Sequence, residues 1–556
     1  MRFLSNKQPI RLHTAVILAF SSLFVTVPVT NAQVADPLLQ AMKQELDRSQ
    51  AKLMLPGMQR PYFIEYRLEE LTDYEAVASY GALNTENHSH QRAVRVTVRI
   101  GSYKSDSSSA RGDGNVQLSA LDNNPDAIRY ALWLATDDAY KSALRAYSAK
   151  QAALKRFETP PTADDFAPTP AIVKIEPLVT LDLDTAAWKQ RIIEASGLYA
   201  TDPATKSFAD TVQYATASVR GIAVNRYTVN TEGTMLRHGY TGYTASFSVG
   251  GQAADGMRLS RDNGSTARLA KDLESAEAFH QRALNDILSY RDLRKAPVVS
   301  GEDYHGPVLF SGDASADTLN RLFVPNVEAD RPEPGTTART QGAYSSSLHA
   351  RVLPELLSAT DNPLLGSFAG RHLVGAYDVD DEGVPAESVN VVVNGKLENF
   401  LIGREPVRDV SASNGHGRAA PAQAARSHSG VMLFTARQQL SDKDMTDHLL
   451  ALAREQKRDV YAVDTLAGEA PRVLWLVHPD GSRQLVRGAS FDELDNRSLR
   501  SSVVAAGGTP YIANTIGPIP QTTIAPSLLF DDIGVKRASE EQQKLPYYPP
   551  PPVGGR

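Results

Sequence analysis

The stretch RAVRVTVRIG at residues 92–101 decides the fold class of the first half of the chain. From residue 94 to residue 100, apolar side chains alternate with polar or charged side chains. The apolar positions are Val94, Val96, Val98 and Ile100, and the polar positions are Arg95, Thr97 and Arg99. In an extended strand these two sets point to opposite faces. The pattern therefore predicts a half-buried strand of an antiparallel sheet.

Two further strand-like runs precede this stretch, at residues 61–70 and 73–83. Helical patterns surround them, at residues 36–53, 125–157 and 268–297. The first helix is expected to begin at Pro37, with Asp36 as its N-cap residue. We therefore predict an N-terminal α+β domain over residues 33–297, built from an antiparallel sheet with long helices.

From about residue 300 the pattern changes to short apolar runs separated by Gly, Asn and Asp turns. Asn394 and Gly395 form a strong hairpin signal. One clear helix follows Ser441, which is suited to be its N-cap residue. We predict a mainly β domain, barrel- or sandwich-like, over residues 298–535, and an α+β fold class for the whole protein. The remaining residues 536–556 are rich in proline and predict an extended tail.

The first 32 residues have the pattern of a secretory signal peptide. Arg2, Lys7 and Arg11 precede an apolar run at residues 15–29, which ends before the small residue Ala32. The alternative is an N-terminal anchor helix, which the short run and its proline disfavour. We expect residues 1–32 to be removed, the mature protein to have no membrane span, and its location to be periplasmic or secreted.

Composition excludes several kinds of chemistry. The chain has no cysteine, so it has no disulfide, thiol nucleophile or thiolate metal ligand. Its net charge of -6 is small for 556 residues, and no long basic stripe is present. These features give no indication of nucleic-acid binding.

The loop YDVDDEGVPAES, residues 377–388, concentrates Asp378, Asp380, Asp381 and Glu382 before a turn at Gly383. It fails as an EF-hand calcium loop, because the twelfth position is a valine where a bidentate glutamate is required. The sequence also lacks the paired histidines of a helical zinc site. A weak cation site and a solvated turn both remain possible interpretations of this loop.

A second unusual stretch is SASNGHGRAA, residues 411–420. Its glycines allow the backbone to approach a ligand closely, and Arg418 could bind a carboxylate. The alternative is a flexible surface loop.

Three segments of the second half resemble, in order and spacing, the C-terminal domain of the TldD/PmbA family. They are HGPVLFSGDASADTLNRL, DVDDEGVPAESVNVVVNGKLENFLIGRE and SASNGHGRAA. The resemblance implies a two-domain α+β protein and a zinc-dependent peptidase assembly. The metal-bearing type carries a His-Glu-x-x-x-His segment after the strand matched by GPVLF, and a later cysteine ligand. Here residues 311–322 contain no histidine, so the chain resembles the PmbA-type member that lacks the metal.

We therefore expect an exported, non-catalytic subunit that holds extended or unfolded peptides. The implied partner is a metal-bearing TldD-type relative in a heterodimer, or a second copy in a homodimer, and zinc is expected only in the partner. The residues predicted to line the peptide cleft are Asp380, Asp381, Glu382, Gly383, Asn414, Gly415, Gly417 and Arg418. One alternative is an active metallopeptidase with another metal set, from His305, His416 or the acids of 378–382. Another is a peptide-binding or scaffold protein without a protease partner.

Overall fold

An eight-stranded sheet forms the first half of the protein, and all its strand pairs are antiparallel except β5 with β7. The computed structural model describes residues 36–108, 114–155, 163–300, 303–332, 339–438 and 440–538. The strand order is β3-β2-β1-β6-β7-β5, with β4 beside β2 and β8 beside β7. The strands are β1 Pro61–Ser79, β2 Ala82–Ser102, β3 Ser105–Asp106, β4 Asn115–Leu118, β5 Val173–Ile175, β6 Val212–Asn230, β7 Met235–Gln252 and β8 Arg258–Ala267.

The alternating stretch lies in β2, and its apolar side chains are fully buried as predicted. The two runs before it are not separate strands, because β1 is continuous from Pro61 to Ser79 and turns into β2 at Tyr80 and Gly81. Both turn residues have positive φ, which permits this tight connection. The prediction of three strands was therefore wrong, and two long strands take their place.

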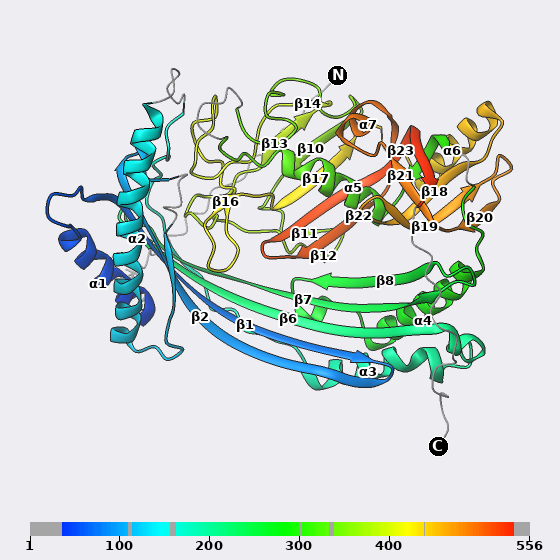
Figure 1. Ribbon diagram of the computed structural model, residues 1–556, viewed down its shortest axis with the longest axis horizontal. Coiled ribbons are helices and arrows are strands. Elements are labelled where there is room, and N and C mark those ends of the chain that lie inside the picture. The colour runs from blue at the N-terminus through cyan, green and yellow to red at the C-terminus, as the bar shows by residue number, and fades with distance from the viewer. Residues whose placement is uncertain are drawn as a thin grey trace, which may run out of the picture. The chain divides into compact units, whose positions relative to one another are not determined.

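Four long helices cover one face of this sheet. They are α1 Pro37–Lys52, α2 Pro125–Leu154, α3 Thr185–Thr201 and α4 Ala276–Lys295. As Figure 1 shows, α1 and α2 pack at one end of the long strands, and α3 and α4 pack at the other. The first helix begins at Pro37 as predicted, and Asn124 caps α2 through its side chain. Three short 3-10 helices lie elsewhere: η1 Lys206–Thr211, η2 Ala270–Asp272 and η3 Val324–Asn326.

The second half contains an open, mixed sheet of eleven strands in the order β14-β13-β10-β17-β23-β9-β18-β19-β20, with β21 and β22 beside β23. Its strands are β9 Tyr304–Phe310, β10 Leu357–Asp361, β13 Val389–Val393, β14 Lys396–Leu397, β17 Val431–Ala436, β18 Val460–Ala467, β19 Ala470–Val477, β20 Arg483–Val486, β21 Ala489–Asp492, β22 Val503–Ile516 and β23 Pro520–Arg537. Two small hairpins lie outside it: β11 Ser367–Phe368 with β12 Arg371–His372, and β15 Gly417–Arg418 with β16 Arg426–Ser427. The helices are α5 Asp313–Leu322, α6 Asp442–Gln456 and α7 Asn496–Ser501.

The α+β fold class is confirmed. Ser441 caps α6 in a full capping box, and Asn394 and Gly395 turn β13 into β14, both as predicted. The barrel-like alternative for the second half is wrong for the described residues, because no sheet there closes on itself.

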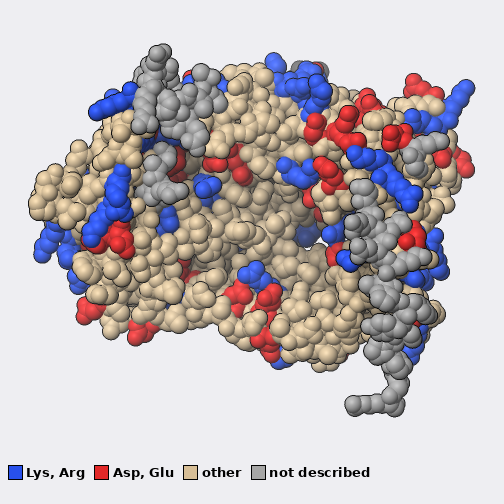
Figure 2. All heavy atoms as spheres, viewed as in Figure 1, with Lys and Arg blue, Asp and Glu red and all other residues tan. Residues whose placement is uncertain are grey.

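The described residues from Pro37 onward belong to one compact unit. The predicted boundary at residue 297 lies between the two sheets in sequence and stays a prediction. The predicted signal peptide and residues 539–556 of the predicted tail lie outside the described residues. No helix in the described ranges is long and apolar enough to cross a membrane. On the face drawn in Figure 2, Lys and Arg are interspersed with Asp and Glu.

The other face of the eight-stranded sheet carries charged side chains and is covered by loops of the second half. Arg67 of β1 and Arg226 of β6 bond to the backbone of residues 419–423. On the same face, Arg95 donates to the carbonyl oxygen of Ala422. The polar face of the β2 pattern therefore meets protein as well as solvent, and it forms the wall of the candidate site.

Candidate functional site

The two unusual loops of the sequence meet in the structure. The backbone N–H of Asp381 donates to the carbonyl oxygen of Gly417 at 2.8 Å. The backbone N–H of Gly417 donates to Oδ2 of Asp380, also at 2.8 Å. Residues 377–388 and 411–420 therefore form one loop pair against the charged face of the sheet.

Asp380 organises its own turn. Its side chain is fully buried, and Oδ1 accepts from the backbone N–H groups of Glu382 and Val384 at 3.0 and 2.8 Å. Burial, together with the neighbouring Glu382, raises the pKa of Asp380 well above its ordinary value. Asp380 thus connects the two loops. Both of its carboxylate oxygens already accept hydrogen bonds from backbone N–H groups.

Asp381 is surrounded by cations. Arg226 contacts its Oδ1, Arg418 donates from Nε to Oδ2 at 3.2 Å, and the backbone N–H of Ala419 donates at 2.7 Å. His238 lies 3.3 Å from Oδ1. Burial alone would raise the pKa of Asp381, but Arg226 and Arg418 outweigh it and hold this pKa below its usual range.

These contacts extend into a buried charge chain of alternating sign. Glu69 lies between Arg67 and Arg226, and Arg226 in turn reaches Asp381, which binds Arg418. All five side chains are at most 7% exposed. The chain of ion pairs joins the first half of the protein to the second. A buried charge without a partner lowers the stability of the fold. The loss of any one of these side chains would therefore leave its neighbours with an uncompensated charge.

The remaining predicted cleft residues shape the backbone. Asn414 accepts from the N–H of Ile402 at 2.9 Å and donates to the carbonyl of Phe400 at 2.8 Å. Gly415 has φ +75, and a Cβ there would lie 2.3 Å from the carbonyl oxygen of Pro385. Gly383 ends the acidic turn with φ +80.

Gly417 is a site of close approach. A Cβ at this position would lie 2.1 Å from Oε2 of Glu382, whose carboxylate accepts from the backbone N–H of Arg404 at 2.6 Å. Burial raises the pKa of Glu382 to about 7, against the opposing effect of Arg404. A side chain at residue 417 would therefore displace this carboxylate.

Residues of the loop pair line three cavities, one of which, of about 460 Å³, is bordered by Arg418 and Ala420. The Arg404 pocket, of about 300 Å³, is lined by Glu382, Arg404 and Arg99 among other residues. The Arg418 pocket, of about 320 Å³, is lined by Arg226, Arg268 and Arg418 with His238, Tyr240 and Tyr377. Each contains part of the predicted cleft: Glu382 in the first, Asp381 and Arg418 in the second. Whether these residues bind peptide stays a prediction.

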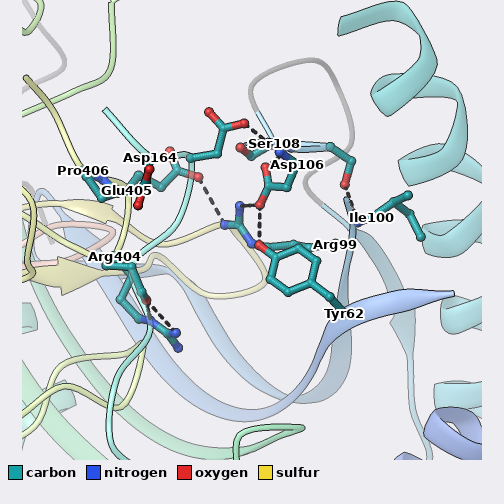
Figure 3. Close-up of polar contacts among 12 residues, drawn as sticks. Tyr62, Arg99, Ile100, Asp106, Ser108, Asp164, Arg404, Glu405 and Pro406 are labelled. Carbon is teal, nitrogen blue, oxygen red and sulfur yellow. Dashed lines mark hydrogen bonds and ion pairs between the residues drawn. The ribbon is translucent and has the colours of Figure 1, made fainter. Parts of the chain in front are cut away.

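The sheet supplies residues that sequence reasoning missed. Figure 3 shows Tyr62 and Arg99 both directed at Asp106, with hydrogen bonds of 2.7 and 3.0 Å. Arg99 also donates to Glu405 of the second half at 3.2 Å. The one signal that could have found them was the repeated arginine on the polar face of β2.

The residues of the alternative metal set lie apart. His416 is fully buried and lies 3.3 Å from Asp361, whereas His305 lies 3.9 Å from Asp532. Asp380 and Asp381 are engaged in the loop pair. Within the described ranges, no three His, Asp or Glu side chains are grouped so that they could hold a metal ion.

The segment after β9 forms α5, as the resemblance implies. It buries Ala314, Ala316 and Leu319 in the core. Asp313 and Asp317 lie one helical turn apart, and burial raises the pKa of both, while Arg472 opposes this effect at both. These donors do not fit a tetrahedral zinc site, which needs at least three protein ligands, commonly including histidine or cysteine.

Comparison with known proteins identifies one domain of this chain. Residues 303–471 match the PmbA/TldA metallopeptidase C-terminal domain. No protein of curated function matches the sequence.

Solved structures share the fold across almost the whole of their length. A protein described as a modulator of a DNA gyrase from Thermotoga maritima is 15% identical, with a TM-score of 0.61, over 89% of this chain and 99% of that one. TldE from Thermococcus kodakarensis is 13% identical, with a TM-score of 0.59, over 89% and 99%. A second protein described as a modulator of DNA gyrase, from Bacteroides thetaiotaomicron, is 13% identical with a TM-score of 0.57, over 90% and 98%.

Proposed function

We propose that this chain is a TldD/PmbA-type protein, because residues 303–471 match the PmbA/TldA metallopeptidase C-terminal domain, and that it is an exported, non-catalytic subunit of a peptidase assembly that holds extended or unfolded peptides. The observation that carries the proposal is α5. The helix is present where the metal-bearing type has His-Glu-x-x-x-His, but it carries Asp313 and Asp317 and no histidine. A zinc-bound water, which would supply the nucleophile for hydrolysis, has no ligand set there.

The peptide-holding role is supported by the interface between the sheet and the loop pair. Peptides in extended conformation are recognised through backbone hydrogen bonds along strand edges and loops, with pockets for alternate side chains. The Arg404 and Arg418 pockets are both lined by residues of one loop pair and supply charged groups of both signs. Asp380, Asn414 and the glycines would hold this loop pair rigid, while Glu382 and Arg418 would face the peptide.

The partner and the location follow from the family type and from residues 1–32. A metal-bearing TldD-type relative would supply the zinc and the catalytic groups, as a heterodimer with this chain. The signal-like segment would place this chain outside the cytoplasm, and a partner would then have to be exported as well.

The experiment is reconstitution. The mature chain and a co-encoded relative carrying His-Glu-x-x-x-His would be purified separately and mixed, and hydrolysis of an unfolded peptide would be followed. We expect no hydrolysis and no stoichiometric zinc with this chain alone, and increased hydrolysis by the mixture. Hydrolysis by this chain alone with bound zinc would contradict the proposal, and so would a relative whose activity this chain leaves unchanged.

Export is tested separately, by fractionation of the native host and N-terminal sequencing. We expect the mature chain to begin at residue 33 and to be found outside the cytoplasm. A cytoplasmic protein that retains residues 1–32 would contradict this part of the proposal.

A further inference from the structure

One edge of the eight-stranded sheet is free over a long stretch. Figure 1 shows β2 along the outer edge of this sheet, and β1 pairs with the inner side of β2 from Ala82 to Ile100. On the outer side, β4 and β3 pair with β2 only from residue 93 onward. Among the described residues, no strand pairs with the outer side of residues 83–91. At the opposite edge of the sheet, by contrast, β8 contacts β22 of the second sheet.

The free edge lacks most of the features that prevent strand addition. Natural proteins protect edge strands with proline, lysine, bulges or a covering segment. Residues 83–91, LNTENHSHQ, contain no proline and no lysine, and all of them except Ser89 are exposed. The pairing register with β1 is unbroken from Thr85 to Arg92, and the single bulge lies at Asn84 beside the turn. The unpaired N–H and C=O groups of such an edge are a template for another strand.

The residues whose backbone groups point to the free edge can be identified. The carbonyl oxygen of Arg92 accepts from the N–H of Ser119 at 2.8 Å, so Arg92 directs its backbone groups outward. In an antiparallel sheet, every second residue of a strand turns its N–H and C=O to the same side. Glu86, His88 and His90 therefore direct their N–H and C=O groups to the free edge.

Exposed apolar side chains lie at both ends of this edge. At the turn between β1 and β2, Tyr80 is 54% exposed and Leu83 is 38% exposed. At the other end, Leu121 is 47% exposed in the segment that follows β4. Arg92 donates to the carbonyl oxygen of Ala120 at 2.9 Å and so holds this segment beside the edge. An antiparallel second copy would bring the turn of each chain to the segment after β4 of the other.

We propose that two copies of this chain pair through the free edge of β2, antiparallel and about a twofold axis at Asn87, so that their eight-stranded sheets become continuous. Glu86 of each copy then lies opposite His88 of the other, and these two residues exchange backbone hydrogen bonds. The glutamate and histidine side chains of each pair are complementary. An interface of this kind uses the same surface on both copies and closes with two of them.

The position of the axis follows from the edge itself. An axis between two residues would set outward-pointing backbone groups of one strand against inward-pointing groups of the other. An axis at Glu86 would place two glutamates directly opposite each other, and like charges in that position are destabilising. An axis at His88 would place Asn84 of the second copy where Ser119 already pairs with Arg92.

This inference goes beyond the proposed function and does not depend on it. Residues 83–91 line neither the Arg404 pocket nor the Arg418 pocket. Pairing through β2 therefore leaves both pockets unchanged, and the reconstitution experiment decides the proposed function whatever the outcome here.

The test uses the mature chain and introduced cysteines. The chain has no cysteine of its own, so a single introduced cysteine reports only its distance from the same residue of the second copy. At Asn87 the two Cα atoms would be about 4.5 Å apart, which a disulfide can span. We expect sedimentation velocity to give twice the mass of one chain, and Asn87→Cys to oxidise to a covalent dimer.

Gln91→Cys is the matched control, because it lies exposed on the same strand but away from the axis. Its two copies would be about 27 Å apart, since each residue of a strand adds about 3.4 Å. We expect no covalent dimer from this variant under the same oxidation.

A second pair of variants tests the backbone. His88→Pro removes an N–H that points to the free edge and does not pair with β1, so the fold should tolerate it. The dimer loses two hydrogen bonds between the copies and should dissociate at a concentration at least about tenfold higher. His88→Ala removes the same imidazole but keeps the N–H, and should remain dimeric. If His88→Pro failed to fold, the two cysteine variants would still decide.

Three results would overturn the proposal. The first is a chain that stays monomeric up to its highest soluble concentration. The second is a dimer in which Asn87→Cys forms a disulfide no faster than Gln91→Cys. The third is a monomer in which an added unfolded peptide protects the backbone of residues 86–90 from hydrogen exchange, because the edge would then bind peptide and not a second copy.

Discussion

Single residues of the buried charge chain connect the two halves of the molecule. Asp381 is the clearest case, because it is 2% exposed and is shared by Arg226 and Arg418. Its ionised form is stabilised by these two arginines and by the backbone N–H of Ala419, and the arginines are stabilised by it. The acidic loop was considered as a metal site. Its central carboxylate, Asp381, instead forms ion pairs with two arginines.

Asp381→Asn should destabilise the protein by about 3–5 kcal/mol, because two buried arginines lose their shared counter-charge. The measurement is urea denaturation at pH 7. The exposed pair of Lys443 and Asp447 provides the control, since Asp447→Asn should change stability by less than ~1 kcal/mol. A loss as small in Asp381→Asn as in this control would show that the buried charge chain does not hold the halves together.

Glu382 should make stability depend on pH. Burial raises its pKa from 4.5 to about 7, so the folded protein binds more protons than the unfolded chain between these values. The contribution of Glu382 to folding stability is therefore largest below pH 4.5 and declines as the pH rises through 7. Gln lacks this titration and keeps an oxygen acceptor for the N–H of Arg404.

At each pH we compare the free energy of unfolding of Glu382→Gln with that of the wild type. We expect this difference to favour the variant more at pH 8 than at pH 5, by at least ~1 kcal/mol. Denaturation curves of both proteins at the two pH values measure this difference. A relative stability that is the same at pH 5 and pH 8 would mean that Glu382 has an ordinary pKa.

At the scale of elements, the loop pair depends on glycine where two backbones touch. Gly415→Ala would place a Cβ 2.3 Å from the carbonyl oxygen of Pro385, at a backbone φ of +75. We expect it to destabilise the protein by ~2 kcal/mol or more, from the overlap and the left-handed conformation together. Thermal denaturation would measure the loss.

Gly366→Ala is the matched control, because a Cβ there meets no atom within 4 Å. It should leave the melting temperature unchanged or slightly raised. If Gly415→Ala behaved like Gly366→Ala, the two loops would not be in the contact described.

The local elements were predictable from sequence because their signals are local. The start of α1 at Pro37, the turn at Asn394 and Gly395, and the cap at Ser441 each depend on a few neighbouring residues. The alternation in β2 likewise predicted which side chains are buried. Strand length was not predictable, because β1 continues through a polar stretch in which the pattern weakens but both neighbouring strands still pair with it.

The site was only partly predictable for a different reason. The sequence indicated both loops. It gave no sign that Asp381 contacts Arg226, which lies 155 residues earlier. The periodicity of a strand shows which of its faces is polar but not which segment packs on that face. Arg95 and Arg99 were assigned to a polar face that could equally have been solvated. The contacts of that face depend on tertiary packing between distant segments.

At the scale of the whole molecule, the two sheets are joined at an interface that includes the Arg404 and Arg418 pockets. The helix that would carry zinc in the metal-bearing type has aspartates instead. Solved structures of 13–15% identity share this fold over 89–90% of the chain. The proposed peptide-holding role places the peptide at this interface.

Substitution of α5 should not restore zinc binding. In Asp313→His with Asp317→His, two imidazoles would lie one turn apart, but no cysteine exists elsewhere in the chain to complete the family set. We expect substoichiometric zinc after dialysis, measured by elemental analysis, and no peptidase activity. Stoichiometric, active zinc in this variant would show that the chain keeps the rest of a catalytic site.

The most direct test of the central claim is fluorescence anisotropy of a labelled, unstructured peptide titrated with the purified mature chain, with and without a metal chelator. A non-catalytic peptide-holding subunit predicts anisotropy that rises to a plateau, stays constant with time and is the same under both conditions. Anisotropy that falls with time without the chelator and remains stable with it would mean metal-dependent cleavage by this chain, and would contradict the account.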